Sequence, residues 1–185
     1  IDPHLRKLGG NAVQKIALTK LLLAIAQSAA TPEDDNAWRE MGWQGMADKC
    51  LSYLDKWHNR FYLYGEQPFL QMPTIQAAAL KTLGVVSPEI STGNTTVLTQ
   101  SQQEQYATDA DKAVTLVVQM AFGLSGKKTD NGVVLTPGYM GKQNEKGKSA
   151  SGKAGSAVGH MGLLHSFWLG NAIVESIWLN LFTRE

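Results

Sequence analysis

One long apolar stretch with helical spacing, 11–29, constrains the fold of this chain more than any other feature. Apolar side chains recur every third or fourth position along it, and a second set beside the first makes the apolar face wide. The two sets comprise Val13, Ile16, Ala17, Leu18, Leu21, Leu22, Ile25 and Ala26. Gln14, Lys15 and Lys20 make the stretch too polar to span a membrane. We therefore predict a helix at the centre of a core, and no membrane association.

Other patterns predict more helices and a few short strands. Thr31 and Pro32 are typical of a helix cap and a first helical residue, and Thr108–Asp111 is typical of a capping box. The predicted helices are 46–57, 76–83, 110–122 and 172–182, and the predicted strands are 61–64, 133–135 and 161–169. A chain of 185 residues fits one domain. We predict the α+β class: a mostly helical, mixed globular domain over 1–185 with a few short strands and long flexible loops.

Apolar residues of four predicted helices are expected to share a single core. These residues are Leu18, Leu22, Ile25, Leu54, Val117 and Trp178. Aromatic residues at apolar periodic positions are expected to pack inside the protein rather than stack on bases. They are Trp57, Phe61, Tyr62, Phe69, Trp168 and Trp178.

The sequence offers no pattern of a metal site or an enzyme. Its single cysteine, Cys50, excludes an intrachain disulfide and a cysteine-rich zinc site, favours a buried apolar role and fits a reducing cytoplasm. His160 and His165 are five residues apart, which is wrong for two ligands on one helix face. A serine-nucleophile elbow is also missing. We therefore expect no catalytic activity, no metal and no cofactor.

Positive charge is concentrated in one segment, Lys127–Lys153. It contains six lysines and two acidic residues, a net charge of +4, whereas the remaining 11 basic and 14 acidic residues give −3. Glycines surround these lysines over 123–159, which predicts a flexible loop region that lacks fixed order without nucleic acid. Glycine lets a backbone approach a phosphate closely, and lysine displaces the counterions of phosphate. The segment therefore predicts nucleic-acid binding, although a merely solvated loop explains its composition equally well.

Several short motifs occur in an order that resembles the CasA family, the large subunit of the type I-E CRISPR Cascade complex. The most specific is an aromatic run, Phe61-Tyr62-Leu63, followed by Gln67-Pro68-Phe69-Leu70-Gln71. After it come Thr92-Gly93-Asn94, Gln119-Met120-Ala121-Phe122, the glycine-rich segment and Leu179-Asn180-Leu181-Phe182. The similarity covers nearly the whole chain, which begins without methionine and is expected to be the N-terminal part of such a subunit. The family's duplex-splitting wedge and C-terminal helical bundle are expected beyond residue 185.

This resemblance implies a non-catalytic, cytoplasmic subunit that recognises the protospacer-adjacent motif of double-stranded target DNA. Its implied partners are the CRISPR RNA, the target DNA, other Cascade subunits and a recruited helicase-nuclease. The family's glycine loop at the DNA minor groove corresponds to Gly123, Ser125, Gly126, Lys127 and Lys128. Separately, the charge of the basic segment predicts phosphate contacts at Lys142, Lys146, Lys148 and Lys153. The loop at the 5′ handle of the RNA corresponds to Val97, Leu98, Thr99 and Gln100. Two departures are Leu124 and Ser125 within the glycine loop, and Val97 where the family often has an aromatic residue.

Two other functions fit the same residues. In the first, the chain is a protein-interaction scaffold whose basic loop binds an acidic partner. In the second, it is a hydrolase without a familiar motif, which requires a pocket of perturbed acids or histidines. Nucleic-acid binding differs from the scaffold in its steep dependence on salt.

Overall fold

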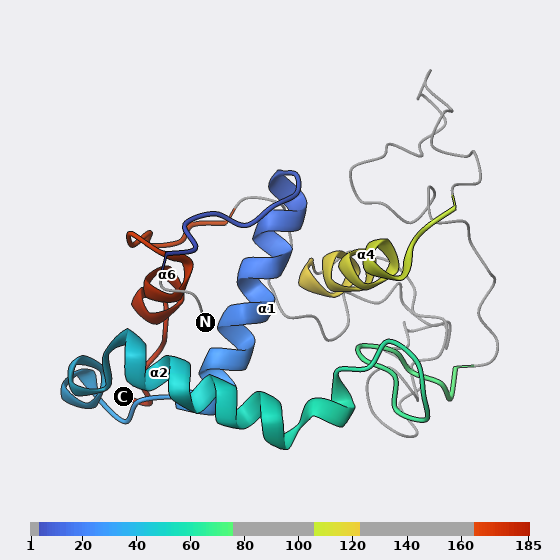
Figure 1. Cartoon of the computed structure of the whole chain (residues 1–185). Helices are drawn as coiled ribbons and strands as arrows, with labels where there is room; N and C mark the ends of the chain where they lie inside the picture. The colour runs from blue at the N-terminus through green and yellow to red at the C-terminus, as the bar shows by residue number, and fades with distance from the viewer. Residues whose placement is uncertain (1–3, 76–105, 123–164) are drawn as a thin grey trace, which may run out of the picture. The chain divides into compact units, whose positions relative to one another are not determined.

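The computed structural model describes residues 4–75, 106–122 and 165–185. The chain divides into two compact units. The first, here the helical unit, comprises Ile1–Phe61 and Leu164–Glu185 and contains α1, α2, a short 3-10 helix η1 (His58–Arg60) and α6. The second, Tyr62–Leu163, contains α4 (Figure 1).

Helix α1 (Ala12–Ala30) confirms the prediction for 11–29. It begins with a capping box that was not predicted from the sequence. The side chain of Asn11 accepts from the N–H of Gln14 at 2.9 Å, and the Gln14 side chain accepts from the N–H of Asn11 at 3.0 Å. These two bonds satisfy backbone donors that a first helical turn leaves without partners.

Helix α2 (Asp35–Lys56) begins earlier than the predicted 46–57, and the predicted cap at Thr31 is wrong. The cap is Asp34, whose carboxylate accepts from the N–H of Ala37 at 2.8 Å. Thr31 instead closes α1, because its hydroxyl donates to the carbonyl of Gln27. Gly42, with φ 58° and ψ −180°, kinks α2 in a backbone region that is open almost only to glycine.

The core of the helical unit is formed where α6 (Ile173–Leu179) packs against α1 and α2 (Figure 1). Its buried residues are Ala26, Ala30, Met46, Ala47, Cys50, Ala172, Val174, Ile177 and Leu181. Small residues of α1 and α2 predominate, which lets these helices approach closely. Cys50 is buried as predicted, and burial raises the pKa of its thiol.

Two tryptophans join α2 to α6. The rings of Trp38 and Trp178 stack with centroids 4.1 Å apart and an interplanar angle of 2°. Each indole N–H donates to the other residue's carbonyl, at 3.0 Å from Trp38 and 3.3 Å from Trp178. The pair therefore fixes both the spacing and the register of the two helices.

The strands predicted at 61–64 and 161–169 are wrong over their described residues, and the ranges 4–75, 106–122 and 165–185 contain no strand. In these segments, backbone groups that would pair with a neighbouring strand form other hydrogen bonds instead. The N–H and carbonyl of Trp168 both bond to the side-chain amide of Asn180, at 3.0 and 2.8 Å. The carbonyl of Tyr62 accepts from Phe69 within a turn. The predicted strand 133–135 and helix 76–83 lie outside the described residues.

The expectation of one shared core is not confirmed. Leu22 and Trp178 pack against the core of the helical unit, whereas Val117 is buried in α4 of the second unit. Three aromatics that were expected inside are instead exposed: Trp57 by 37%, Tyr62 by 58% and Trp168 by 76%. Trp57 is the C-cap of α2, and Tyr62 and Trp168 lie in described segments that form no strand.

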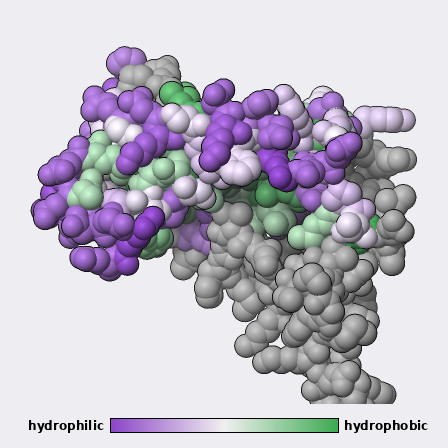
Figure 2. All heavy atoms as spheres, turned by 90° about the horizontal axis from the view of Figure 1, so that it is seen from below, coloured by the Kyte–Doolittle hydropathy of each residue, from purple (hydrophilic) through white to green (hydrophobic). Residues whose placement is uncertain are grey.

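Helix α4 (Asp109–Ala121) confirms the predicted helix and its capping box, in which the Thr108 hydroxyl and the N–H of Asp111 are 3.2 Å apart. Val117, Val118 and Ala121 form its buried side. Figure 2 shows a face on which hydrophilic side chains cover most of the described residues. None of the helices in the described ranges is both long and apolar enough to cross a membrane.

Candidate nucleic-acid interface

Every residue that the sequence assigns to nucleic-acid contact lies outside the described residues. For DNA these are Gly123, Ser125, Gly126, Lys127, Lys128, Lys142, Lys146, Lys148 and Lys153, and for the RNA handle they are Val97, Leu98, Thr99 and Gln100. Their roles stay predictions, and so does the flexibility expected for 123–159.

Helix α4 lies between these two segments in the sequence. The RNA-handle loop precedes its N-cap Thr108, and Gly123 directly follows its C-cap Phe122. The helix has 13 residues and is about 20 Å long at 1.5 Å per residue. Ala121 and Phe122 are buried, with 1% and 2% exposure, so the residue from which the predicted glycine loop starts is anchored.

The aromatic and proline motif that carries the resemblance forms a closed loop over 62–71. The N–H of Phe69 donates to the carbonyl of Tyr62 at 2.8 Å, and the Gln71 side chain donates to the carbonyl of Leu63 at 2.7 Å. Leu70 has φ 55°, a left-handed conformation that is uncommon for a residue other than glycine. This reversal returns the chain toward Leu63. Gln71 therefore has a local structural role: its amide closes the loop.

Tyr64, in this loop, reaches the first turn of α4. Its hydroxyl donates to Asp109 Oδ1 at 2.6 Å, and Lys112 Nζ donates to the same oxygen at 3.0 Å and to the Tyr64 hydroxyl at 3.2 Å. The hydrogen bond from Tyr64, followed by that from Lys112, lowers the pKa of Asp109. The hydrogen bonds to Asp109 and Tyr64 raise the pKa of Lys112. The sequence did not predict this cluster of Tyr64, Asp109 and Lys112. It joins the motif loop to α4, the helix between the two segments predicted to contact nucleic acid.

We expect Tyr64→Phe to raise the pKa of Asp109 toward its ordinary value, because the substitution removes the largest cause of the shift. A lowered carboxyl pKa in the folded state stabilises the fold above the unfolded-state pKa, and this contribution is lost as the pH falls through the folded-state pKa. Carboxyl-detected NMR titration measures the change. Asp111, whose pKa is lowered by Thr108, is the internal control. An unshifted Asp109 titration would show that Tyr64 does not bond to it in solution.

A hollow of about 400 Å³ lies between this loop and α4. It is lined by Leu63, Tyr64, Gln71, Lys112, Thr115, Leu116 and Gln119. Lys112 is the cation of this lining, and it is already paired with Asp109 at 3.0 Å. The described residues of this lining therefore offer little positive charge for a phosphate.

His165, one of the two histidines that were considered as metal ligands, contacts a lysine. In the helical unit His165 Nε2 lies 3.5 Å from Nζ of Lys20, and burial lowers the pKa of this lysine. Over 4–75, 106–122 and 165–185 no three His, Cys, Asp or Glu side chains gather as metal ligands. The His165–Lys20 pair is therefore a polar contact next to the apolar face of α1.

Two solved structures resemble this chain in fold. The crystal structure of Thermobifida fusca Cse1 has a TM-score of 0.65 and 25% sequence identity, over 96% of this chain and 33% of that one. The structure of Thermus thermophilus CasA (Cse1) has a TM-score of 0.62 and 20% identity, over 100% of this chain and 36% of that one. The chain thus spans about a third of the length of these structures. No curated protein matches it.

The model of a protein family agrees with these likenesses. The model of the family of CRISPR-associated protein Cse1 matches residues 3–185, which is nearly the entire sequence. The resemblance to CasA noted from the motif order is thereby confirmed, since the Thermus structure carries both names. The chain belongs to the family of CRISPR-associated protein Cse1.

Proposed function

We propose that this chain is a non-catalytic, cytoplasmic nucleic-acid-binding subunit of a CRISPR surveillance complex of the Cascade type. In this proposal it recognises the protospacer-adjacent motif in double-stranded target DNA and contacts the 5′ handle of the CRISPR RNA. Its further partners are other Cascade subunits and the recruited helicase-nuclease. Membership of the Cse1 family over residues 3–185 is the observation that carries the proposal.

The concentration of lysine and glycine in one segment supports the DNA-binding part. Reading a minor groove requires a backbone that comes near the base edges, together with cations for the flanking phosphates. Gly123 and Gly126 supply the first property, and Lys127 and Lys128 supply the second. Since Phe122 is buried at the end of α4, this glycine loop starts from a fixed point.

The structure also supports a connection between the two proposed contacts. The RNA-handle residues Val97–Gln100 precede α4 and the glycine loop follows it. The cluster of Tyr64, Asp109 and Lys112 holds the first turn of this helix against the motif loop. Changes in α4 are therefore expected to affect both contacts together.

We expect Lys127→Ala with Lys128→Ala to weaken binding of the assembled complex to duplex DNA, whether or not the motif is present. Each lost phosphate contact lowers the slope of log affinity against log salt by about 1, so the double variant should lose about 2. The measurement is a titration of the reconstituted complex with labelled duplexes at several salt concentrations.

The matched control is Lys7→Ala with Lys15→Ala, which removes two exposed lysines outside the basic segment. This pair should leave the slope unchanged. If Lys127→Ala with Lys128→Ala also leaves it unchanged, the basic segment is only a solvated surface. The protein-scaffold alternative would be favoured if an acidic polypeptide displaced DNA from the complex while Lys127→Ala with Lys128→Ala left the DNA affinity unchanged.

A further inference from the structure

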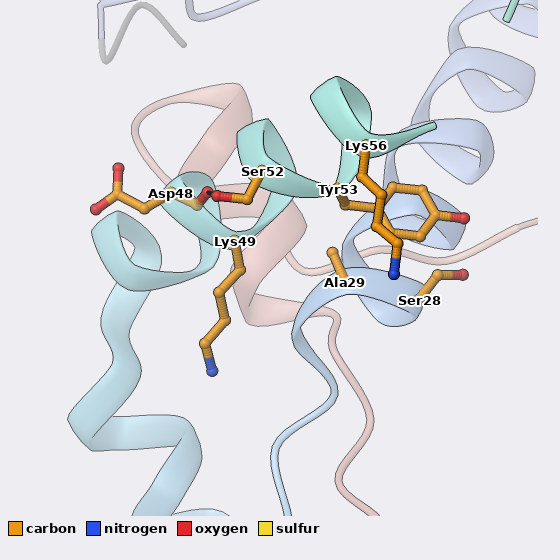
Figure 3. A pocket seen from close by; sticks show the side chains of 7 residues that line it. All are labelled: Ser28, Ala29, Asp48, Lys49, Ser52, Tyr53 and Lys56. Carbon is orange, nitrogen blue, oxygen red and sulfur yellow. Dashed lines mark hydrogen bonds between the residues drawn. The ribbon is translucent and has the colours of Figure 1, made fainter. Parts of the chain in front are cut away.

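A second hollow, also of about 400 Å³, lies in the helical unit between the end of α1 and the second half of α2 (Figure 3). Ser28 and Ala29 line it from α1. The lining from α2 consists of Asp48, Lys49, Ser52, Tyr53 and Lys56. None of these residues belongs to the segments assigned to the proposed function.

The hollow has a positive edge. Lys49 and Lys56 are seven residues apart on α2, so they lie on one face about 10 Å apart along the axis. Both are exposed, and the ion pairs of the described part of the chain, Lys112–Asp109 and Arg184–Glu33, include neither of them. Figure 3 shows Asp48 extending away from both lysines. Two cations are therefore available to an anion at this edge.

The neighbouring polar groups favour an anionic ligand that accepts hydrogen bonds. The hydroxyls of Ser28 and Ser52 donate within their own helices, to the carbonyls of Ala24 at 2.8 Å and Asp48 at 3.0 Å. They are therefore committed, and the donors that remain are the two ammonium groups and the phenol of Tyr53. All three can donate to phosphate oxygens.

Aromatic rings continue the same face of α2. Trp57 is 37% exposed, its ring lies 5.3 Å from Lys56 Nζ, and its centroid is 6.4 Å from that of Tyr53 at an angle of 48°. Lysines that alternate with accessible aromatic rings are typical of surfaces that bind single-stranded nucleic acid, where the cations follow the backbone and the rings stack on bases. An acidic protein partner would need the lysines but not the rings.

We propose that this basic-aromatic face, formed by Lys49, Tyr53, Lys56 and Trp57, binds single-stranded nucleic acid. The lysines and the phenol contact consecutive phosphates at the hollow, and Trp57 stacks on a base at its end. Its residues are distinct from 97–100 and 123–153, so an experiment can contradict this proposal without contradicting the proposed function, and the reverse.

The test is fluorescence anisotropy of the complete chain with labelled oligothymidylate and oligouridylate of about 16 nucleotides, at several salt concentrations. Each phosphate contact on a single strand contributes about 0.7 to the salt slope, so Lys49→Ala with Lys56→Ala should lower it by about 1.4. Trp57→Ala should weaken binding about tenfold with little change in slope, since stacking carries no charge. Lys49→Arg with Lys56→Arg should retain binding. The two probes distinguish DNA from RNA as the source of the strand.

Each measurement is repeated in the Lys127→Ala, Lys128→Ala background, where the same differences should appear if the α2 face binds by itself. An unchanged salt slope in the α2 lysine variant would overturn the proposal. It would also be overturned if that variant lowered only the melting temperature, because the lysines would then serve the negative ends of the α1 and α2 dipoles. Displacement by polyglutamate, with no effect of Trp57→Ala, would instead identify an acidic protein as the ligand and equally contradict it.

Discussion

Trp178→Ala is expected to lower the free energy of unfolding of the helical unit by about 3 kcal/mol. The substitution removes a ring that stacks on Trp38 at 4.1 Å, and it leaves the carbonyl of Trp38 without its indole donor. Trp178 is only partly buried, which places the loss at the lower end of the range for tryptophan in a core. Because this pair joins α2 to α6, the loss should appear as a lower midpoint of the entire helical unit.

Trp168→Ala is the matched control for this prediction. Trp168 is 76% exposed, and only its backbone atoms bond to the side chain of Asn180. Its replacement should change the stability by less than about 0.5 kcal/mol. Chemical denaturation followed by far-ultraviolet circular dichroism measures both variants. Equal losses in the two variants would contradict the role given to the tryptophan pair.

Gly126→Val is expected to abolish most of the preference of the assembled complex for DNA with the protospacer-adjacent motif. A β-carbon with two methyl groups holds the backbone away from the floor of the minor groove. Contacts to a base pair are worth about 1–3 kcal/mol each, so the affinity ratio between duplexes with and without the motif should fall at least about fivefold. Affinity for DNA without the motif should change little, since the lysines are retained.

Gly147→Val provides the comparison, because this glycine lies in the same basic segment but outside the predicted glycine loop. It should leave the affinity ratio intact. If Gly126→Val also leaves it intact, the glycine loop is placed at the wrong residues, and the family assignment is unaffected.

Local signals in the sequence were sufficient to predict part of the fold. The wide apolar face of α1 and the capping box of α4 both depend on residues within a few positions, and both helices were found within one residue of their starts. The first half of α2 was missed because Gly42 interrupts the apolar pattern before Met46.

The predicted strands failed for a different reason. β-Prone aromatic residues form a strand only where a second strand supplies the ladder bonds. At Trp168 the side chain of Asn180, twelve residues away, occupies both backbone groups. The strand propensity of residues 161–169 does not indicate that a side chain twelve residues away from Trp168 bonds to its backbone.

The cluster of Tyr64, Asp109 and Lys112 depended on contacts between distant residues and was therefore not visible in the sequence. Tyr64 and Asp109 are 45 residues apart, and nothing in their neighbours indicates that they meet. The basic-aromatic face lies on α2 and its C-cap alone, and it was missed because its Trp57 was assigned to the core from periodicity. By contrast, the family was correctly identified from motif order, because order does not depend on where the motifs lie in space.

Leaving the chain out of the assembly shows whether it recognises the motif within a Cascade-type complex, as we propose. The complex is assembled with and without it, and each assembly is titrated with two duplexes that share the sequence complementary to the guide and differ only in the motif. We predict that the complete assembly prefers the duplex with the motif and that the assembly without this chain binds both equally. An undiminished preference in the assembly without the chain would show that another subunit recognises the motif.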